Sequence, residues 1–69
     1  MIKYIITAKS GNHRGFYYRP NNLNPESFLW WGLDIATKFD SIDKARAVIL
    51  ELKGRWKGIR DFQVEEIYT

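Results

Sequence analysis

The chain has 69 residues, of which 45% are hydrophobic, 16% aromatic and 28% charged, and this length suits one small globular domain with a single core. It contains no cysteine, which excludes disulfides, thiolate metal sites and thiol nucleophiles and favours a cytoplasmic location. The apolar run within residues 1–10 is too short for a signal peptide or a membrane span, so we expect neither secretion nor membrane insertion.

The net charge of +3 is unevenly distributed along the chain. Residues 1–25 carry cations and no acid, residues 26–43 are mainly acidic, residues 44–60 are mainly basic, and residues 61–69 are acidic again. A domain that only coats phosphates has no need of two acidic blocks, so this pattern weakens a purely nucleic-acid-binding interpretation. Mixed charge suits a protein partner equally well.

The N-terminal part of the chain predicts a β-hairpin. Apolar residues alternate with other residues over 2–9, which is the period of a half-buried strand. Turn-forming residues at 10–15 are followed by β-prone residues at 16–19, so the chain is expected to turn back there. Pro20 should end this second strand, and a polar, asparagine-rich loop should continue to Pro25.

The middle of the chain is harder to interpret. Residues 28–31 and 36–39 have the composition of strands, but Gly32 and Asp34 interrupt them. Both one bent strand and two separate strands fit this pattern.

A helix is predicted from about residue 41 onward. Asp40 or Ser41 can cap its N-terminus, and Asp43 suits the positive end of its dipole. Apolar residues recur on one face with helical spacing, at Ala45, Val48, Ile49, Leu52 and Trp56. Cations in the last turns complement the dipole, and Gly58 is placed to end the helix in the left-handed conformation.

Residues 62–68 predict a final strand. The fold class expected is therefore α+β, a small antiparallel sheet of three to four strands in β-β-β-α-β order with one helix packed on one face. The other face of the sheet would be open to water or to a partner.

Few residues of the chain offer catalytic chemistry. His13 lies in a glycine-flanked turn with no nearby acid to orient it, and no base is apparent for the serines. Asp34, Asp40 and Asp43 could together hold a magnesium ion, but capping of the helix is the preferred interpretation for the last two. No glycine spacing matches a phosphate-binding or dinucleotide-binding motif, so we expect no enzyme, no cofactor and no metal site.

The helix carries a first candidate contact surface. A rotation of about 100° per residue places Arg46, Lys53 and Lys57 on one stripe with Leu50 between them. A leucine framed by cations is a plausible ridge for binding a protein. The alternative is a solvated basic flank with one stray apolar residue.

Aromatic residues form a second candidate surface, because six fall in the predicted sheet before the helix: Phe16, Tyr17, Tyr18, Trp30, Trp31 and Phe39. Successive side chains of a strand point to opposite faces, so some of these rings, with Tyr17 and Trp31 as the candidates, are expected on the open face beside Lys9, Arg14 and Arg19. Aromatic rings interleaved with cations can stack on bases or anchor a protein interface. The alternative is that both sheet faces are covered.

Eight residues are therefore candidate partner contacts, on the basis of their expected exposure and their charge or ring chemistry. They are Arg14, Tyr17, Arg19, Trp31, Arg46, Leu50, Lys53 and Lys57. A small domain without disulfides would also gain stability from burying rings between two copies, so a homodimer is an open alternative.

One set of positions is spread along the chain and consists of Tyr17-Tyr18, Trp31, residues 36–41, Ala45, Ile49 and residues 62–66. Its distribution resembles a pattern found among very small phage and prophage accessory proteins. The resemblance covers most of the chain and implies a fold and a phage or mobile-element origin more than an activity. Small phage proteins of this kind, such as anti-CRISPR and other anti-defence proteins, act by binding a host machine without catalysis of their own. It therefore implies a host protein complex as the partner. No membrane partner is expected, because the N-terminal apolar run is too short to insert.

A second resemblance is to the arm-type DNA-binding domain of tyrosine recombinases, in which a three-stranded sheet enters the major groove and a helix supports it. Residues 15–19, residues 30–33 and the helix from Ser41 are similar to that layout. The insertion at 21–27 and the extra C-terminal strand depart from it. This resemblance implies the alternative function, a sequence-specific DNA-binding module that reads DNA with aromatic and basic residues of the sheet.

Overall fold

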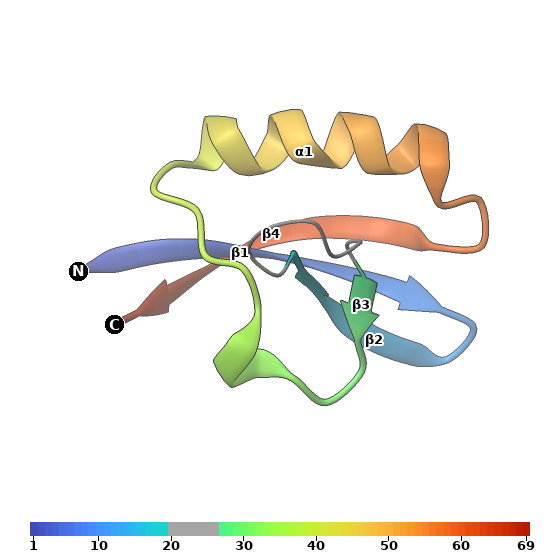
Figure 1. Cartoon of the computed structure of the whole chain (residues 1–69), viewed down its shortest axis with the longest axis horizontal. Coiled ribbons are helices and arrows are strands. Elements are labelled where there is room, and N and C mark those ends of the chain that lie inside the picture. Colours follow the sequence, from blue (N-terminus) through green and yellow to red (C-terminus); the bar gives the residue numbers. More distant parts are fainter. Residues whose placement is uncertain (20–26) are drawn as a thin grey trace.

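The computed structural model describes residues 1–19 and 27–69, which form a four-stranded antiparallel sheet with an α-helix on one face (Figure 1). The elements in chain order are β1 (Ile2–Ser10), β2 (His13–Tyr18), β3 (Ser27–Leu29), the short 3₁₀ helix η1 (Leu33–Ile35), α1 (Ile42–Arg55) and β4 (Arg60–Tyr68). The strand order across the sheet is β3-β2-β1-β4. The predicted fold class and element order are confirmed. The predicted loop from Pro20 to Pro25 lies outside the described residues.

A two-residue turn joins β1 to β2. Ser10 pairs with His13, which leaves Gly11 and Asn12 as the turn. Gly11 has φ 62°, and glycine at the first position of a two-residue hairpin turn adopts this conformation without steric cost. The Arg60 guanidinium donates a hydrogen bond of 3.1 Å to the Gly11 carbonyl, so β4 is tied to the tip of the hairpin.

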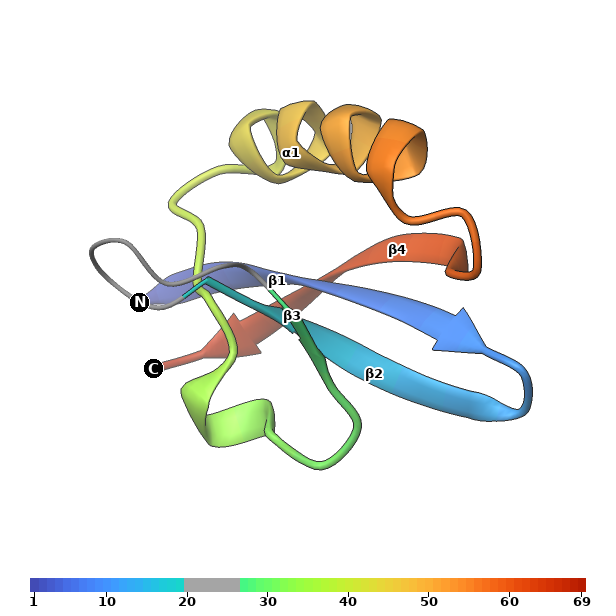
Figure 2. The same cartoon turned by 45° about the vertical axis from the view of Figure 1, so that its right-hand side comes forward.

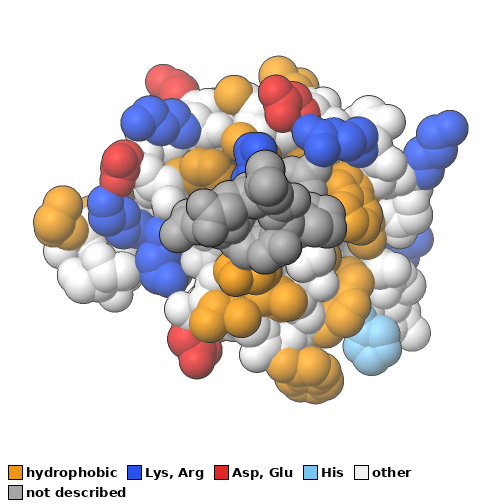
Figure 3. All heavy atoms as spheres, viewed as in Figure 1, with side chains coloured by type: hydrophobic (Ala, Val, Ile, Leu, Met, Phe, Trp, Pro, Cys, Tyr) orange, Lys and Arg blue, Asp and Glu red, His pale blue; other side chains and the backbone are white. Residues whose placement is uncertain are grey.

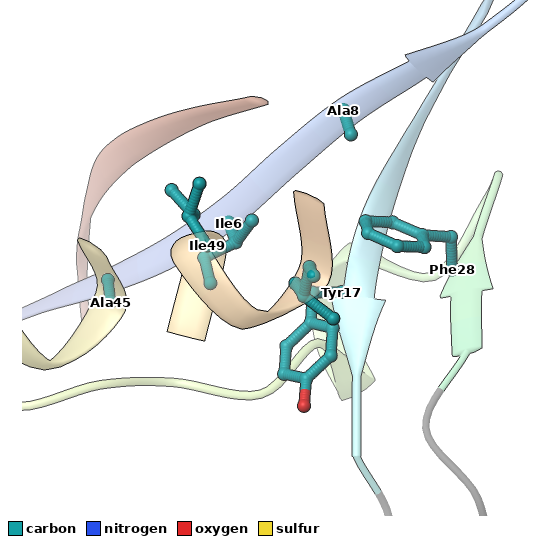
Figure 4. Packing of buried hydrophobic residues seen from close by; sticks show 7 residues of the cluster. Ile6, Ala8, Tyr17, Phe28, Ala45 and Ile49 are labelled. Carbon is teal, nitrogen blue, oxygen red and sulfur yellow. The ribbon is translucent and has the colours of Figure 1, made fainter. Parts of the chain in front are cut away.

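The main core lies between the sheet and α1. Its buried residues come from β1, β2, β3 and α1, and Figure 4 shows several of them; they are Ile6, Ala8, Tyr17, Phe28, Ala45, Ile49 and Leu52. Aromatic rings fill much of the space, because Tyr17 meets Phe28 edge-on at 5.9 Å between ring centroids and stacks with Phe39 at 6.2 Å. Trp30 packs against this cluster over Gly15.

The N-terminus of α1 is capped by Ser41. Its hydroxyl oxygen accepts a hydrogen bond of 3.3 Å from the Lys44 N–H, which satisfies one of the free donors of the first turn. Asp40, the other predicted cap, instead forms an ion pair with Lys3 of β1. The two predicted capping candidates thus hold the same end of the helix in different ways.

The C-terminus of α1 differs from the prediction. The helix ends at Arg55, and Trp56 leaves it with its N–H still bonded to the Leu52 carbonyl at 2.8 Å. Trp56 turns toward the core, where its ring meets that of Phe28 edge-on at 5.4 Å. Lys57 therefore lies beyond the helix, and Gly58 does not have the positive φ expected of it, so both predictions are wrong.

The segment between β3 and α1 crosses from one side of the sheet to the other. Figures 1 and 2 both place η1 on the side opposite α1. The crossing is fixed by hydrogen bonds: the Thr37 N–H donates to the Tyr17 carbonyl at 2.9 Å, and Phe39 and Tyr4 exchange two backbone bonds of 3.0 and 2.7 Å. The strand-like residues of this region thus form the three-residue β3 and an isolated bridge at Phe39.

The sheet face away from α1 is covered in its central part. Ile5 and Thr7 alternate with the helix-facing residues of β1 and are nevertheless 1% and 0% exposed. The crossing segment lies on that side and contributes the buried Ala36. The expectation of one open face is therefore wrong at Ile5 and Thr7, which are buried on that face. The Arg14 guanidinium, which donates to the Thr7 hydroxyl, is one of the groups that cover it.

Candidate functional site

Three of the four predicted ridge residues line a groove between α1 and β4. Arg46, Leu50 and Lys53 lie along it, and its volume is about 460 Å³. The other lining residues are Ile49, Phe62, Gln63 and Val64. Lys57 does not line the groove, because the helix has ended before it.

The groove combines an apolar floor with two cations. Leu50 is 73% exposed, while Phe62 and Val64 are half-buried against the core. Arg46 and Lys53 are seven residues apart on α1, which is about 10.5 Å along a helix axis. Within residues 1–19 and 27–69 neither cation forms an ion pair, so both are available to a partner.

An exposed apolar patch forms a second candidate surface, at η1. Trp31 is 91% exposed, Ile35 56% and Leu33 46%. In Figure 3 hydrophobic side chains gather over the lower part of the face, on the side of the sheet where η1 lies in Figure 1. The expected exposure of Trp31 is confirmed, and Leu33 and Ile35 are exposed as well.

Tyr17 was expected on an open face, and this expectation is wrong. It is 1% exposed and belongs to the core cluster. The register places it opposite Phe28 of β3, on the face that α1 covers, as Figure 4 shows. Tyr17 therefore positions the core and cannot contact a partner without unfolding.

Arg14 is held by two neighbours. Its Nη1 donates to the Thr7 hydroxyl at 2.7 Å, and its Nη2 donates to Oδ2 of Asp61 at 2.6 Å. Arg19 is exposed, and its backbone N–H donates to the Thr37 hydroxyl at 2.7 Å. Of the eight candidate contacts, the structure thus brings Arg46, Leu50 and Lys53 together at the groove. The other five do not line it.

Among the acidic residues weighed as metal ligands, Asp40 forms an ion pair with Lys3. The hydrogen bond and charge of Lys3, with a smaller effect of Lys44, hold the pKa of the Asp40 carboxyl below its ordinary value. In the part of the chain that the structure describes, no three histidine, aspartate or glutamate side chains are grouped so that they could hold a metal ion. Asp34, Asp40 and Asp43 accordingly do not gather at one point.

Comparison with protein-family models, curated proteins and solved structures finds no match for this chain. Neither helix of the described residues has the length and apolar character needed to cross a membrane. The functional interpretation therefore depends on the groove and on the η1 patch.

Proposed function

We propose that this protein is a non-enzymatic binding protein that engages a partner protein through the α1–β4 groove. The observation that carries the proposal is the pair of cations, Arg46 and Lys53, which flank the exposed Leu50 over an apolar floor without an acidic partner in the described residues. Such a surface is complementary to an acidic partner that offers an apolar anchor. The η1 patch supplies a second contact area, because an exposed tryptophan is a frequent anchor of protein interfaces.

The kind of partner proposed is a host protein complex, which the protein would modulate or inhibit. The resemblance to small phage accessory proteins supports this proposal, and a defence machine of CRISPR type or a nucleic-acid-processing machine would be the class of target. The host cytoplasm is the compartment that such a target implies, and the absence of cysteine agrees with it.

A DNA-binding module is the alternative, and the geometry supports it less well. Reading DNA with the sheet requires exposed rings and cations on one sheet face. Tyr17 is buried in the core under α1, and Ile5 and Thr7 on the opposite face are buried as well. Arg14 is engaged by Thr7 and Asp61.

A tagged pull-down from bacterial lysate, with and without nuclease, tests the proposal. We expect a defined protein to be retained after nuclease treatment, to be lost with the variant Arg46→Glu/Lys53→Glu and to be kept by Lys57→Glu, which changes the charge outside the groove. Recovery of nucleic acid alone, lost on nuclease treatment, would favour the DNA-binding alternative. Equal recovery by all three proteins would remove the groove from the proposal.

A further inference from the structure

The strand that borders the groove lies at the edge of the sheet. Within the described residues β4 pairs with β1 alone, over most of the nine residues from Arg60 to Tyr68. An edge strand presents the unpaired N–H and C=O groups of alternate residues, which another strand can pair with. The groove between α1 and β4 therefore offers backbone hydrogen-bonding groups in addition to an apolar surface.

The groove runs along this edge strand. Phe62 and Val64 contact the core on the side of α1. Gln63 lies between them and pairs with Thr7, on the opposite face, where its side-chain amide donates to Asp61 at 3.4 Å. Gln63 also lines the groove, so the groove follows the β4 chain from Phe62 to Val64.

We propose that the groove binds an extended, acidic segment of a partner protein that adds as a strand to β4. This inference rests on the proposed function and specifies its binding mode. Strand addition draws affinity from main-chain hydrogen bonds and specificity from alternate side chains. One apolar side chain of the segment would lie over Leu50 and the groove floor, with carboxylates reaching the two cations.

The spacing of the cations defines the segment further. Arg46 and Lys53 are about 10.5 Å apart along the helix axis, and side chains four residues apart in a strand are on one face and about 13 Å apart. The long arginine and lysine side chains can span the difference. The segment therefore has the pattern acidic-x-apolar-x-acidic, with the apolar residue two positions from each carboxylate.

Charge favours such a segment over a second copy of the chain. A two-fold interface brings the same patch of each subunit against itself. A second copy would offer its own β4, whose helix-facing side chains are Phe62, Val64 and, two positions further on, Glu66, so it would bring a single carboxylate to the two cations. An acidic segment neutralises the same cations.

Binding of a synthetic peptide tests the charge pattern. The probe is a labelled peptide with a central valine, a glutamate two positions away on each side, and threonine elsewhere, titrated by fluorescence anisotropy. We expect saturable binding, weakened about tenfold or more in Arg46→Glu/Lys53→Glu and unchanged in Lys57→Glu. The same peptide with lysine in place of glutamate should bind the double variant better than the original protein. Circular dichroism verifies that each variant is folded.

Backbone methylation tests strand addition itself. Two further peptides carry N-methyl groups on one or the other set of alternate residues, so that only one set blocks the hydrogen bonds to β4. We expect one peptide to lose binding and the other to keep it. Equal binding of both would overturn strand addition and leave groove recognition intact.

Two further outcomes separate this inference from the proposed function. If the unmethylated peptide does not bind while the lysate partner still depends on Arg46 and Lys53, the binding mode is overturned and the proposed function stands. If sedimentation shows a dimer that Arg46→Glu/Lys53→Glu dissociates, the groove belongs to a second copy and the peptide assignment is overturned.

Discussion

Trp30 and Trp31 are neighbours in the chain with opposite surroundings. Trp30 packs against the core and stacks on Phe28, with 6.4 Å between ring centroids, whereas Trp31 is 91% exposed. We expect Trp31→Ala to change the free energy of unfolding by less than about 0.5 kcal/mol and Trp30→Ala to lower it by about 3 kcal/mol. Urea titration of both variants measures the difference. Similar losses for the two would contradict this division of roles.

Gly15 is required by the close approach of Trp30. A Cβ at this position would lie 2.3 Å from the tryptophan ring, so Gly15→Ala must displace the ring or the strand. We expect a loss of about 1 to 3 kcal/mol in the free energy of unfolding, as for other overpacked cores. Gly54→Ala is the matched control, because a Cβ there meets no atom within 4 Å and alanine favours the helix by about 0.5 to 1 kcal/mol. If neither Gly15→Ala nor Gly54→Ala changed the free energy of unfolding, the steric argument would be wrong.

The ion pair between Asp40 and Lys3 should make stability depend on pH. The hydrogen bond and charge of Lys3 lower the pKa of Asp40 below its ordinary value of 3.8. A carboxylate with a lowered folded-state pKa contributes stability that is fully present above its unfolded-state pKa and is lost as the pH falls through the folded-state pKa. We therefore expect Asp40→Asn to be less stable than the original chain at neutral pH and equally stable at low pH.

Urea midpoints measured over a series of pH values test this expectation. The control is the same comparison in a Lys3→Gln background, where the pH-dependent difference should shrink because the main cause of the lowered pKa is removed. A difference between Asp40→Asn and the original chain that stays constant with pH would show that the ion pair does not act through the titration of Asp40.

At the scale of the elements, β4 contains a bulge that depends on an aspartate in an unusual conformation. Thr7 pairs with Gln63 and Lys9 with Arg60, so β4 has one extra residue opposite β1. Asp61 lies in the bulge with φ 58°, a left-handed conformation that costs most residues about 1 to 2 kcal/mol but that asparagine and aspartate adopt more readily.

Substitution of Asp61 separates its backbone role from its ion pair with Arg14. Both Asp61→Asn and Asp61→Ala remove the charge, but only alanine opposes the left-handed backbone. We expect Asp61→Ala to be less stable than Asp61→Asn by about 1 kcal/mol, measured by urea unfolding. Identical midpoints for the two variants would mean that the bulge relaxes without strain.

The elements with local determinants were predicted well. Ser41, the first-turn Asp43 and the spacing of apolar residues place the start and the buried face of α1, because these signals act within a few residues. The end of the helix was missed because Trp56 is drawn into the core by Phe28, a contact between distant residues. The segment from β3 to α1 was missed for the same reason, since its path is set by hydrogen bonds to Tyr17 and Tyr4.

The candidate site was predicted in part. Again the part set by local geometry was predicted, and the part set by contacts between distant residues was not. Arg46, Leu50 and Lys53 share a stripe that follows from helical geometry alone, and the structure places all three along the groove. The burial of Tyr17 depends on which sheet face the helix covers, which strand periodicity cannot specify. The β4 side of the groove, Phe62 to Val64, likewise required the strand order.

At the scale of the whole molecule, β1 is the centre of stability. It pairs with β2 on one side and β4 on the other, and four successive residues, Ile5 to Ala8, are buried, on both faces of the sheet. β3 has three residues and lies at the opposite edge. We expect hydrogen exchange to be slowest in β1 and, among the strands, fastest in β3. Comparable protection in β1 and β3 would contradict this hierarchy.

The same measurement connects the architecture to the proposed binding mode. In β4 the amides that pair with β1 should exchange slowly, while the alternate amides at the open edge should exchange fast. When the acidic peptide with its central valine is added, the edge amides should become protected and those already paired with β1 should change little. A protein that binds the peptide without added protection at alternate β4 amides would hold it through side chains alone. Strand addition requires the alternating pattern, because main-chain hydrogen bonds to an edge strand involve every second residue.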